Sequence, residues 1–126
     1  MTRTIFVMAI AAMLLPNTAI AAQTSLQIEL NTARDFERHV MTYDCATETP
    51  VTVTYINAAP NFLALVPVAE EPEELVFASV VAASGVRYVS GKWAWWTRGS
   101  DASLYDTTLG ENADAVLTCS EFINTP

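Results

Sequence analysis

The stretch from Ser84 to Leu104 constrains the fold of this chain more than any other part. It contains all three tryptophans and three of the four glycines. Between Lys92 and Arg98, Trp93, Trp95 and Thr97 alternate with the remaining residues, which is the period of a β-strand bounded by turns. Because tryptophans fall on both faces, this strand is either well buried or presents one face to a partner. Ser84-Gly85 and Arg98-Gly99 then form two tips that each present a polar side chain, which indicates a binding edge.

Two motifs in this stretch resemble those of a known family. Ser84-Gly85-Val86-Arg87-Tyr88 resembles the Ser-Gly-x-x-Tyr motif of the MliC/PliC family of inhibitors of c-type lysozyme. The segment Trp93–Leu104 resembles that family's second motif, Tyr-x-x-x-Thr-Lys-Gly-x-x-Ala-x-Leu, with Trp93 in place of the tyrosine and Arg98 in place of the lysine. The motifs occur in the family's order. The resemblance implies an all-β fold, a small antiparallel eight-stranded β-barrel, and a protein that is not an enzyme but inhibits one.

The resemblance also implies a binding site for c-type lysozyme. That enzyme works with two carboxyl groups in a cleft, one an acid and the other a nucleophile or stabiliser. The family's motif serine and lysine enter the cleft and occupy those groups. Ser84 matches directly, and Arg98 keeps the positive charge and can bind a carboxylate through two N–H groups. The lysozyme-binding residues implied in this way are Ser84, Gly85, Tyr88, Thr97, Arg98 and Gly99.

Each of these residues also has a simpler interpretation. Arg98 could pair with Asp101 on the surface, where an ion pair contributes little. Ser84 could be only a turn residue before Gly85. Tyr88 and Trp93 fit core or loop-supporting aromatics better than contacts. For the whole protein, the alternatives are a small exported barrel that binds an apolar ligand in a pocket lined by tryptophan side chains, and a structural or assembly protein of the envelope.

The first 22 residues have the organisation of a secretory signal peptide. A basic residue, Arg3, precedes an apolar run from Ile5 to Leu15, and the segment ends with Ala19-Ile20-Ala21-Ala22. The run is too short to span a bilayer core of about 30 Å. No cysteine lies near the cleavage site. We therefore expect a soluble periplasmic product, residues 23–126, without a membrane anchor; the sequence leaves its oligomeric state open.

The expected product is strongly acidic. It retains all 14 acidic residues but loses Arg3 from the six basic ones, which leaves a formal charge of −9. This charge disfavours binding to nucleic acid or anionic lipid. It would attract a cationic partner and accelerate association at low salt. The c-type lysozymes are strongly basic, so this charge suits the partner that the resemblance implies, although acidic exported domains are also common for solubility alone.

Two cysteines, Cys45 and Cys119, lie in the exported part. An even pair in an oxidising compartment predicts one disulfide. It would close a loop of about 75 residues, for which the chain-entropy model gives about 4.5 kcal/mol of stabilisation. Two free thiols or a pair of metal ligands are the alternatives. A single histidine and the absence of a nearby cysteine pair argue against zinc.

Short alternating segments separated by turn residues predict about eight strands, the pattern of an antiparallel barrel or sandwich. Val51–Asn57 is the clearest, because it is rich in β-branched and aromatic residues. The chain turns at Ala58–Asn61. The remaining predicted strands are Leu26–Leu30, His39–Cys45, Phe62–Val68, Leu75–Ala83, Lys92–Arg98, Ala102–Tyr105 and Ala115–Phe122.

The sequence contains little that indicates catalysis or a cofactor. The one histidine, His39, lies in a strand-like segment and fits a surface or packed residue. The four glutamates of Glu70–Glu74 could form a catalytic or metal-binding cluster, but a solvated hairpin loop explains them better. The glycines match neither a phosphate loop nor a dinucleotide fingerprint. We therefore expect no catalytic residues, no metal and no cofactor.

Overall fold

The computed structural model describes residues 5, 9–16 and 24–122, which belong to two units, Met1–Leu30 and Asn31–Pro126. The expected signal peptide, residues 1–22, lies mostly outside the described residues. The strand predicted at Leu26–Leu30 is wrong, because these residues adopt no regular structure and Leu26 is 85% exposed. Alternation alone does not make a strand, since a strand needs a neighbour for its backbone hydrogen bonds. Within the described ranges, no helix has the length and apolarity needed to cross a membrane.

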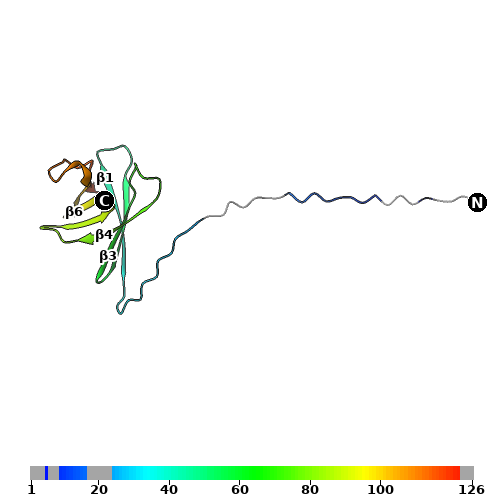
Figure 1. The fold of residues 1–126 in the computed structure, drawn as a ribbon, viewed down its shortest axis with the longest axis horizontal. Coiled ribbons are helices and arrows are strands. Elements are labelled where there is room, and N and C mark those ends of the chain that lie inside the picture. Colours follow the sequence, from blue (N-terminus) through cyan, green and yellow to red (C-terminus); the bar gives the residue numbers. More distant parts are fainter. Residues whose placement is uncertain (1–4, 6–8, 17–23, 123–126) are drawn as a thin grey trace, which may run out of the picture. The chain divides into compact units, whose positions relative to one another are not determined.

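The second unit is a closed antiparallel β-barrel of eight strands (Figure 1), which confirms the expected fold class. Each strand pairs with the next one along the chain, and the last pairs with the first. A short 3₁₀ helix, η1 (Thr107–Leu109), follows the seventh strand. The strands are β1 (Glu37–Cys45), β2 (Val51–Ala58), β3 (Asn61–Val66), β4 (Leu75–Val80), β5 (Val86–Ser90), β6 (Trp93–Arg98), β7 (Asp101–Asp106) and β8 (Leu117–Glu121).

The number of strands was predicted correctly, but one member of the set differs. β5 was not predicted as a strand, and it takes the place of the strand wrongly expected at Leu26–Leu30. The other seven strands overlap their predicted ranges, and the turn predicted at Ala58–Asn61 joins β2 to β3. β5 is short and carries Arg87 between two apolar residues. Its place in the barrel depends on pairing with β6, in which Tyr88 lies opposite Trp95.

The barrel interior is filled by side chains from all eight strands. Trp95, Phe77, Val53 and Val66 are its largest fully buried members. Trp95 lies opposite Tyr88 on one side and Leu104 on the other, so three neighbouring strands contribute to one layer of the core. Burial of side chains of this size stabilises the fold by about 1.5–3 kcal/mol each. The interior of this small barrel is therefore a packed core.

A disulfide between Cys45 and Cys119 joins β1 to β8, as predicted. The two cysteines lie directly opposite each other where the last strand meets the first, with 4.0 Å between their Cα atoms. Both are buried. The bond therefore links covalently the two strands that close the barrel, which lie 74 residues apart in the sequence.

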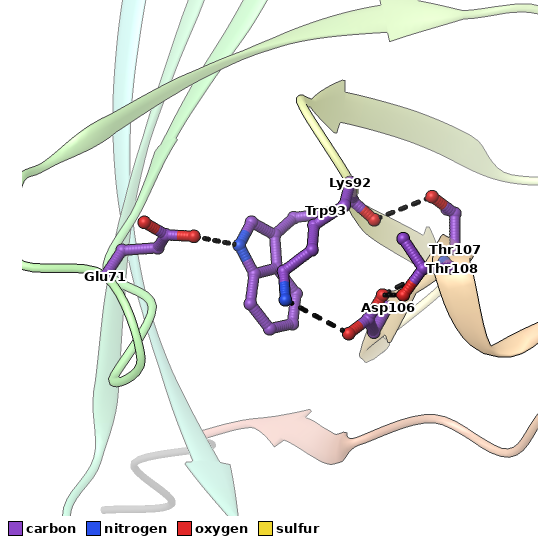
Figure 2. Close-up of polar contacts among 6 residues, drawn as sticks. All are labelled: Glu71, Lys92, Trp93, Asp106, Thr107 and Thr108. Carbon is purple, nitrogen blue, oxygen red and sulfur yellow. Dashed lines mark hydrogen bonds and ion pairs between the residues drawn. The ribbon is translucent and has the colours of Figure 1, made fainter.

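Polar contacts tie three connections together at one end of the barrel (Figure 2). The indole N–H of Trp93 donates a hydrogen bond to the Glu71 carboxylate at 2.7 Å. The ammonium of Lys92 lies 3.3 Å from the Asp106 carboxylate and 4.6 Å from the centre of the Trp93 ring. The backbone N–H of Thr107 donates to the Lys92 carbonyl at 2.8 Å. The acidic segment Glu70–Glu74 is thus the loop between β3 and β4, as predicted, and Glu71 attaches it to the core.

Candidate functional site

The two predicted tips lie side by side at the end of the barrel opposite to these contacts. The Ser84 tip precedes β5 and the Arg98 tip ends β6, and these strands are paired with Val86 opposite Thr97. Gly85 has a φ of +65°, in the left-handed region that favours glycine. A Cβ atom at this position would lie 2.0 Å from the Thr97 carbonyl oxygen. The close approach of the tips therefore requires glycine here.

Trp96 connects the two tips on the outer face of the barrel. Its indole N–H donates a hydrogen bond to the Ser84 carbonyl at 2.7 Å. The guanidinium of Arg98 lies 4.0 Å from the centre of its ring, and that of Arg87 lies 5.9 Å away. Trp96 was not among the predicted site residues. The signal was present, because the period of two places Trp96 on the face opposite to Trp93 and Trp95.

Arg98 is exposed and its charge is not neutralised within the described part of the chain. The ion pairs found there join His39 to Glu37 and Lys92 to Asp106. The surface pair that Arg98 could form with Asp101 is absent from this set, although the two residues lie opposite each other in the β6–β7 hairpin. Asp101 accepts a hydrogen bond from the Ser120 hydroxyl at 3.0 Å instead. The guanidinium N–H groups of Arg98 thus remain available to an external acceptor.

The other motif residues support the tips in different ways. Gly99 has a φ of +58° in the exposed turn after Arg98, and no described atom lies within 4 Å of a Cβ built there. Thr97 donates its hydroxyl to the Val86 carbonyl at 3.3 Å, which fastens one tip to the other. Tyr88 was included among the lysozyme-binding residues, but its side chain is only 6% exposed and belongs to the core. It supports the site from inside the barrel, in agreement with the alternative interpretation of Tyr88 as a core or loop-supporting aromatic residue.

A cluster of buried and partly buried aromatic residues lies beneath the tips. The hydroxyl groups of Tyr43 and Tyr55 are 2.7 Å apart, and the Trp95 indole N–H donates to the Tyr55 oxygen at 2.8 Å. The Tyr88 ring packs 5.6 Å from the Tyr55 ring. Burial raises the pKa of Tyr43, Tyr55 and Tyr88 above the ordinary value for tyrosine. These three residues therefore stay neutral at physiological pH and act as uncharged support for β6.

Shallow hollows adjoin the tips. One lies on the outer face and is lined by Trp96, Arg98, Asp101, Ser103, Tyr105 and Thr118. By contrast, Trp93 is 3% exposed and Trp95 is fully buried, so both fill the core. They take up the space that an apolar ligand would need inside the barrel. This packing disfavours the alternative in which the tryptophans line an internal pocket.

Charge is distributed unevenly between the two ends of the barrel. Because all neighbouring strands are antiparallel, the β1–β2, β3–β4, β5–β6 and β7–β8 connections share one end, which we call the acidic end. The opposite end, the tip end, has no charged residue in its three connections, residues 59–60, 81–85 and 99–100. The connections of the acidic end contain seven carboxylates and one lysine, namely Glu48, Glu70, Glu71, Glu73, Glu74, Glu111, Asp114 and Lys92.

Comparisons with known proteins identify relatives of this chain. Two curated relatives carry the name "Membrane-bound lysozyme inhibitor of C-type lysozyme". The one from Pseudomonas aeruginosa is 44% identical over 80 residues, which cover 63% of this chain and 61% of the relative. The one from Cupriavidus necator is 35% identical over 75 residues, covering 60% and 58%. The matches thus span about three fifths of the relatives' length.

A solved structure shares the fold. It is described as P. aeruginosa MliC in complex with hen egg white lysozyme, and it matches with a TM-score of 0.66 and 31% identity over 80% of this chain and 100% of that chain. A family model described as "Membrane-bound lysozyme-inhibitor of c-type lysozyme" matches residues 43–112, a range that includes both tips. This chain therefore belongs to the MliC family.

Proposed function

We propose that this protein inhibits c-type lysozyme by placing the Ser84 and Arg98 tips in the enzyme's active-site cleft. The observation that carries the proposal is the geometry of the tips. They are held side by side by the close approach of Gly85 to Thr97, and they present an exposed guanidinium without an ionic partner among the described residues. The names of the curated relatives and the lysozyme complex of the structural relative support the same partner.

In this mechanism each tip takes one carboxyl group of the enzyme. The Ser84 hydroxyl forms a hydrogen bond with one of them, and the Arg98 guanidinium donates two N–H groups to the other. Such charge-assisted pairs are shorter and about twice as strong as neutral hydrogen bonds. With both groups occupied, the enzyme has neither a free acid nor a free nucleophile, and the tips exclude the substrate from the cleft. The protein itself need not perform any chemistry, so we propose an inhibitor that is not an enzyme.

The proposed site of action is the periplasm. Export would follow from the signal-like segment 1–22, and cleavage after Ala21 or Ala22 would release a chain without a lipid anchor. Intact mass and N-terminal sequencing of the protein recovered from the cell envelope test this part. A lipidated mass, or a protein that retains Met1 in the envelope, would contradict it.

A lysis assay against c-type, g-type and i-type lysozymes tests the function itself. We expect inhibition of the c-type enzyme and none, or far weaker inhibition, of the other two. The folded Arg98→Glu variant should lose the activity, because it sets like charges together in a site that excludes water. Lys92→Glu is the matched control, since it makes the same charge change at the acidic end. Full inhibition by Arg98→Glu would show that the site is elsewhere, and no inhibition by the wild type would exclude the function.

A further inference from the structure

We propose that Trp96 is a positioning residue that makes the two tips act as one rigid unit, and that it does so with its ring still stacked on Arg98 in the complex. The inference rests on the proposed function. It concerns a position that the family's second motif leaves unspecified, and it accounts for the arginine that replaces the family's lysine at position 98.

The contacts of Trp96 reach both tips from opposite parts of one side chain. The indole N–H donates to the Ser84 carbonyl at 2.7 Å, while the ring lies 4.0 Å from the Arg98 guanidinium. Ser84 itself is exposed and has no regular secondary structure around it. This hydrogen bond is therefore a direct constraint on the position of the Ser84 tip. Without Trp96, the β5–β6 strand pairing, the close approach at Gly85 and the Thr97–Val86 hydrogen bond would remain between the tips.

Arginine suits this arrangement better than lysine. A guanidinium is planar, so it can stack on an aromatic face while the N–H groups at its edge stay free for a carboxylate. An ammonium group is a compact, strongly hydrated charge on a flexible stem, and stacking it on the ring would direct part of its donor set away from the partner. Stacking also limits the rotamers of the Arg98 side chain in the free protein, so that less conformational freedom is lost on binding. The pair of Trp96 and Arg98 thus presents a preorganised cation.

The test is a double-mutant cycle between Trp96 and Arg98, in which the inhibition constant for c-type lysozyme is measured for each variant. Trp96→Leu should weaken inhibition by about 10- to 30-fold, since it removes both contacts. Trp96→Phe keeps a ring beneath the guanidinium and loses only the hydrogen bond to Ser84, so it should weaken inhibition by about 5-fold. In an Arg98→Ala background, the penalty of Trp96→Leu should fall to about 5-fold or less, because the stacking partner is already absent.

Two further variants separate positioning from other roles. Arg98→Lys should weaken inhibition in the wild-type background and have little effect once Trp96 is leucine. Leu109→Ala is the control, because this apolar side chain is 61% exposed in η1, in the β7–β8 connection at the acidic end. Leu109→Ala should stay within about threefold of wild type. Thermal unfolding of each variant verifies that it is folded.

Several outcomes would overturn the inference. If the fold-losses of inhibition caused by Trp96→Leu and by Arg98→Ala multiply in the double variant, Trp96 contacts the enzyme independently of Arg98. Tighter inhibition by Trp96→Leu would mean that Arg98 must leave the ring in order to bind. The free protein supplies a readout that does not depend on lysozyme: the side-chain NMR resonances of Arg98 should show a ring-current shift that Trp96→Leu abolishes. If wild type fails to inhibit but this shift is present, the proposed function is wrong and the positioning contact stands; if the shift is absent, the positioning contact is wrong.

Discussion

Arg98 is the residue on which inhibition should depend most. If its guanidinium pairs with a cleft carboxylate away from water, truncation leaves a desolvated charge without a partner, which typically costs about 2–5 kcal/mol. Arg98→Ala should therefore weaken inhibition by about 30-fold or more, since about 1.4 kcal/mol is tenfold. Arg98→Lys should stay within about tenfold of wild type. Ser84→Ala, which removes one hydrogen bond to a charged group, should have a smaller effect than Arg98→Glu.

Lys92→Ala is the control for this series. Lys92 also lies over a tryptophan ring of β6, at 4.6 Å from the centre of Trp93, but at the opposite end of the barrel. Lys92→Ala removes the same charge as Arg98→Ala, so any general effect of net charge appears in both variants. Inhibition constants measured side by side should differ by about 30-fold or more. Equal losses in Arg98→Ala and Lys92→Ala would show that charge, and not the tip, is responsible.

Gly85 and Gly91 provide a comparison that isolates the contact between the tips. Both have positive φ values, +65° and +54°, so alanine strains the backbone at either position. Only at Gly85 would the added Cβ meet a backbone oxygen, that of Thr97 at 2.0 Å; at Gly91 nothing lies within 4 Å. Gly85→Ala should therefore destabilise the protein by about 1–3 kcal/mol more than Gly91→Ala. Denaturant unfolding measures this difference.

Inhibition should separate the two glycine variants more sharply than stability does. Gly85→Ala pushes the Ser84 tip away from Arg98, so inhibition should weaken by about tenfold or more, a loss of about 1.4 kcal/mol. Gly91 lies in the β5–β6 turn at the acidic end, so the inhibition constant of Gly91→Ala should stay within about twofold of the wild-type value. If folded Gly85→Ala inhibits as well as Gly91→Ala, inhibition does not depend on the spacing of the tips.

At the scale of elements, most of the barrel could be predicted from alternation and turn residues, and the two errors have a common cause. Leu26–Leu30 alternates well but forms no strand pair with any described residue, whereas β5 alternates poorly and is held by its pairing with β4 and β6. Pairing is a non-local property that the local sequence does not contain. Alternation does place Trp96 on the outer face, but only the folded hairpin brings its indole N–H to the Ser84 carbonyl.

Asp106 shows how one carboxylate stabilises a connection. It precedes η1 and accepts hydrogen bonds from the hydroxyl and the backbone N–H of Thr108 within that helix, and it pairs with Lys92. These contacts lower the pKa of Asp106 below the usual value of 3.8. The hydrogen bond from the Thr108 hydroxyl contributes most, followed by the bond from the Thr108 backbone N–H and by Lys92. A lowered pKa means that the folded state holds the proton less well than the unfolded state. Its stabilising contribution is therefore present above about pH 4 and is lost as pH falls through the folded-state pKa.

Asp106→Asn should accordingly lower the free energy of unfolding at pH 7, and the difference from wild type should shrink as pH falls below about 4. Thermal or denaturant unfolding at pH 7, 5, 4 and 3 measures the trend. Glu111→Gln makes the same charge change in the connection that follows β7, and Glu111 has no partner among the described ion pairs, so this variant serves as the control. A difference between Asp106→Asn and wild type that does not vary with pH would show that the charge of Asp106 contributes nothing.

For the whole molecule, the sequence predicts the net charge but not its arrangement. A formal charge of −9 for residues 23–126 suits a basic partner. The barrel places seven of these carboxylates in the connections of the acidic end and none in those of the tip end. The six residues of β6 between the two ends span about 20 Å along the strand. This separation is about twice the screening length of 8–10 Å at physiological ionic strength.

Attraction of a basic enzyme by the acidic end should therefore be a low-salt effect. At about 0.01 M salt the screening length is about 30 Å, so the carboxylates at that end act on the whole approaching enzyme. Neutralising two of them, Glu73→Gln with Glu74→Gln, should lower the association rate at low salt, leave the dissociation rate unchanged, and have little effect near 0.15 M. Stopped-flow association at several salt concentrations, with the tryptophan fluorescence as signal, measures this. If the double variant slows association equally at both salt concentrations, or speeds dissociation, these glutamates contact the enzyme directly and the acidic end is part of the interface.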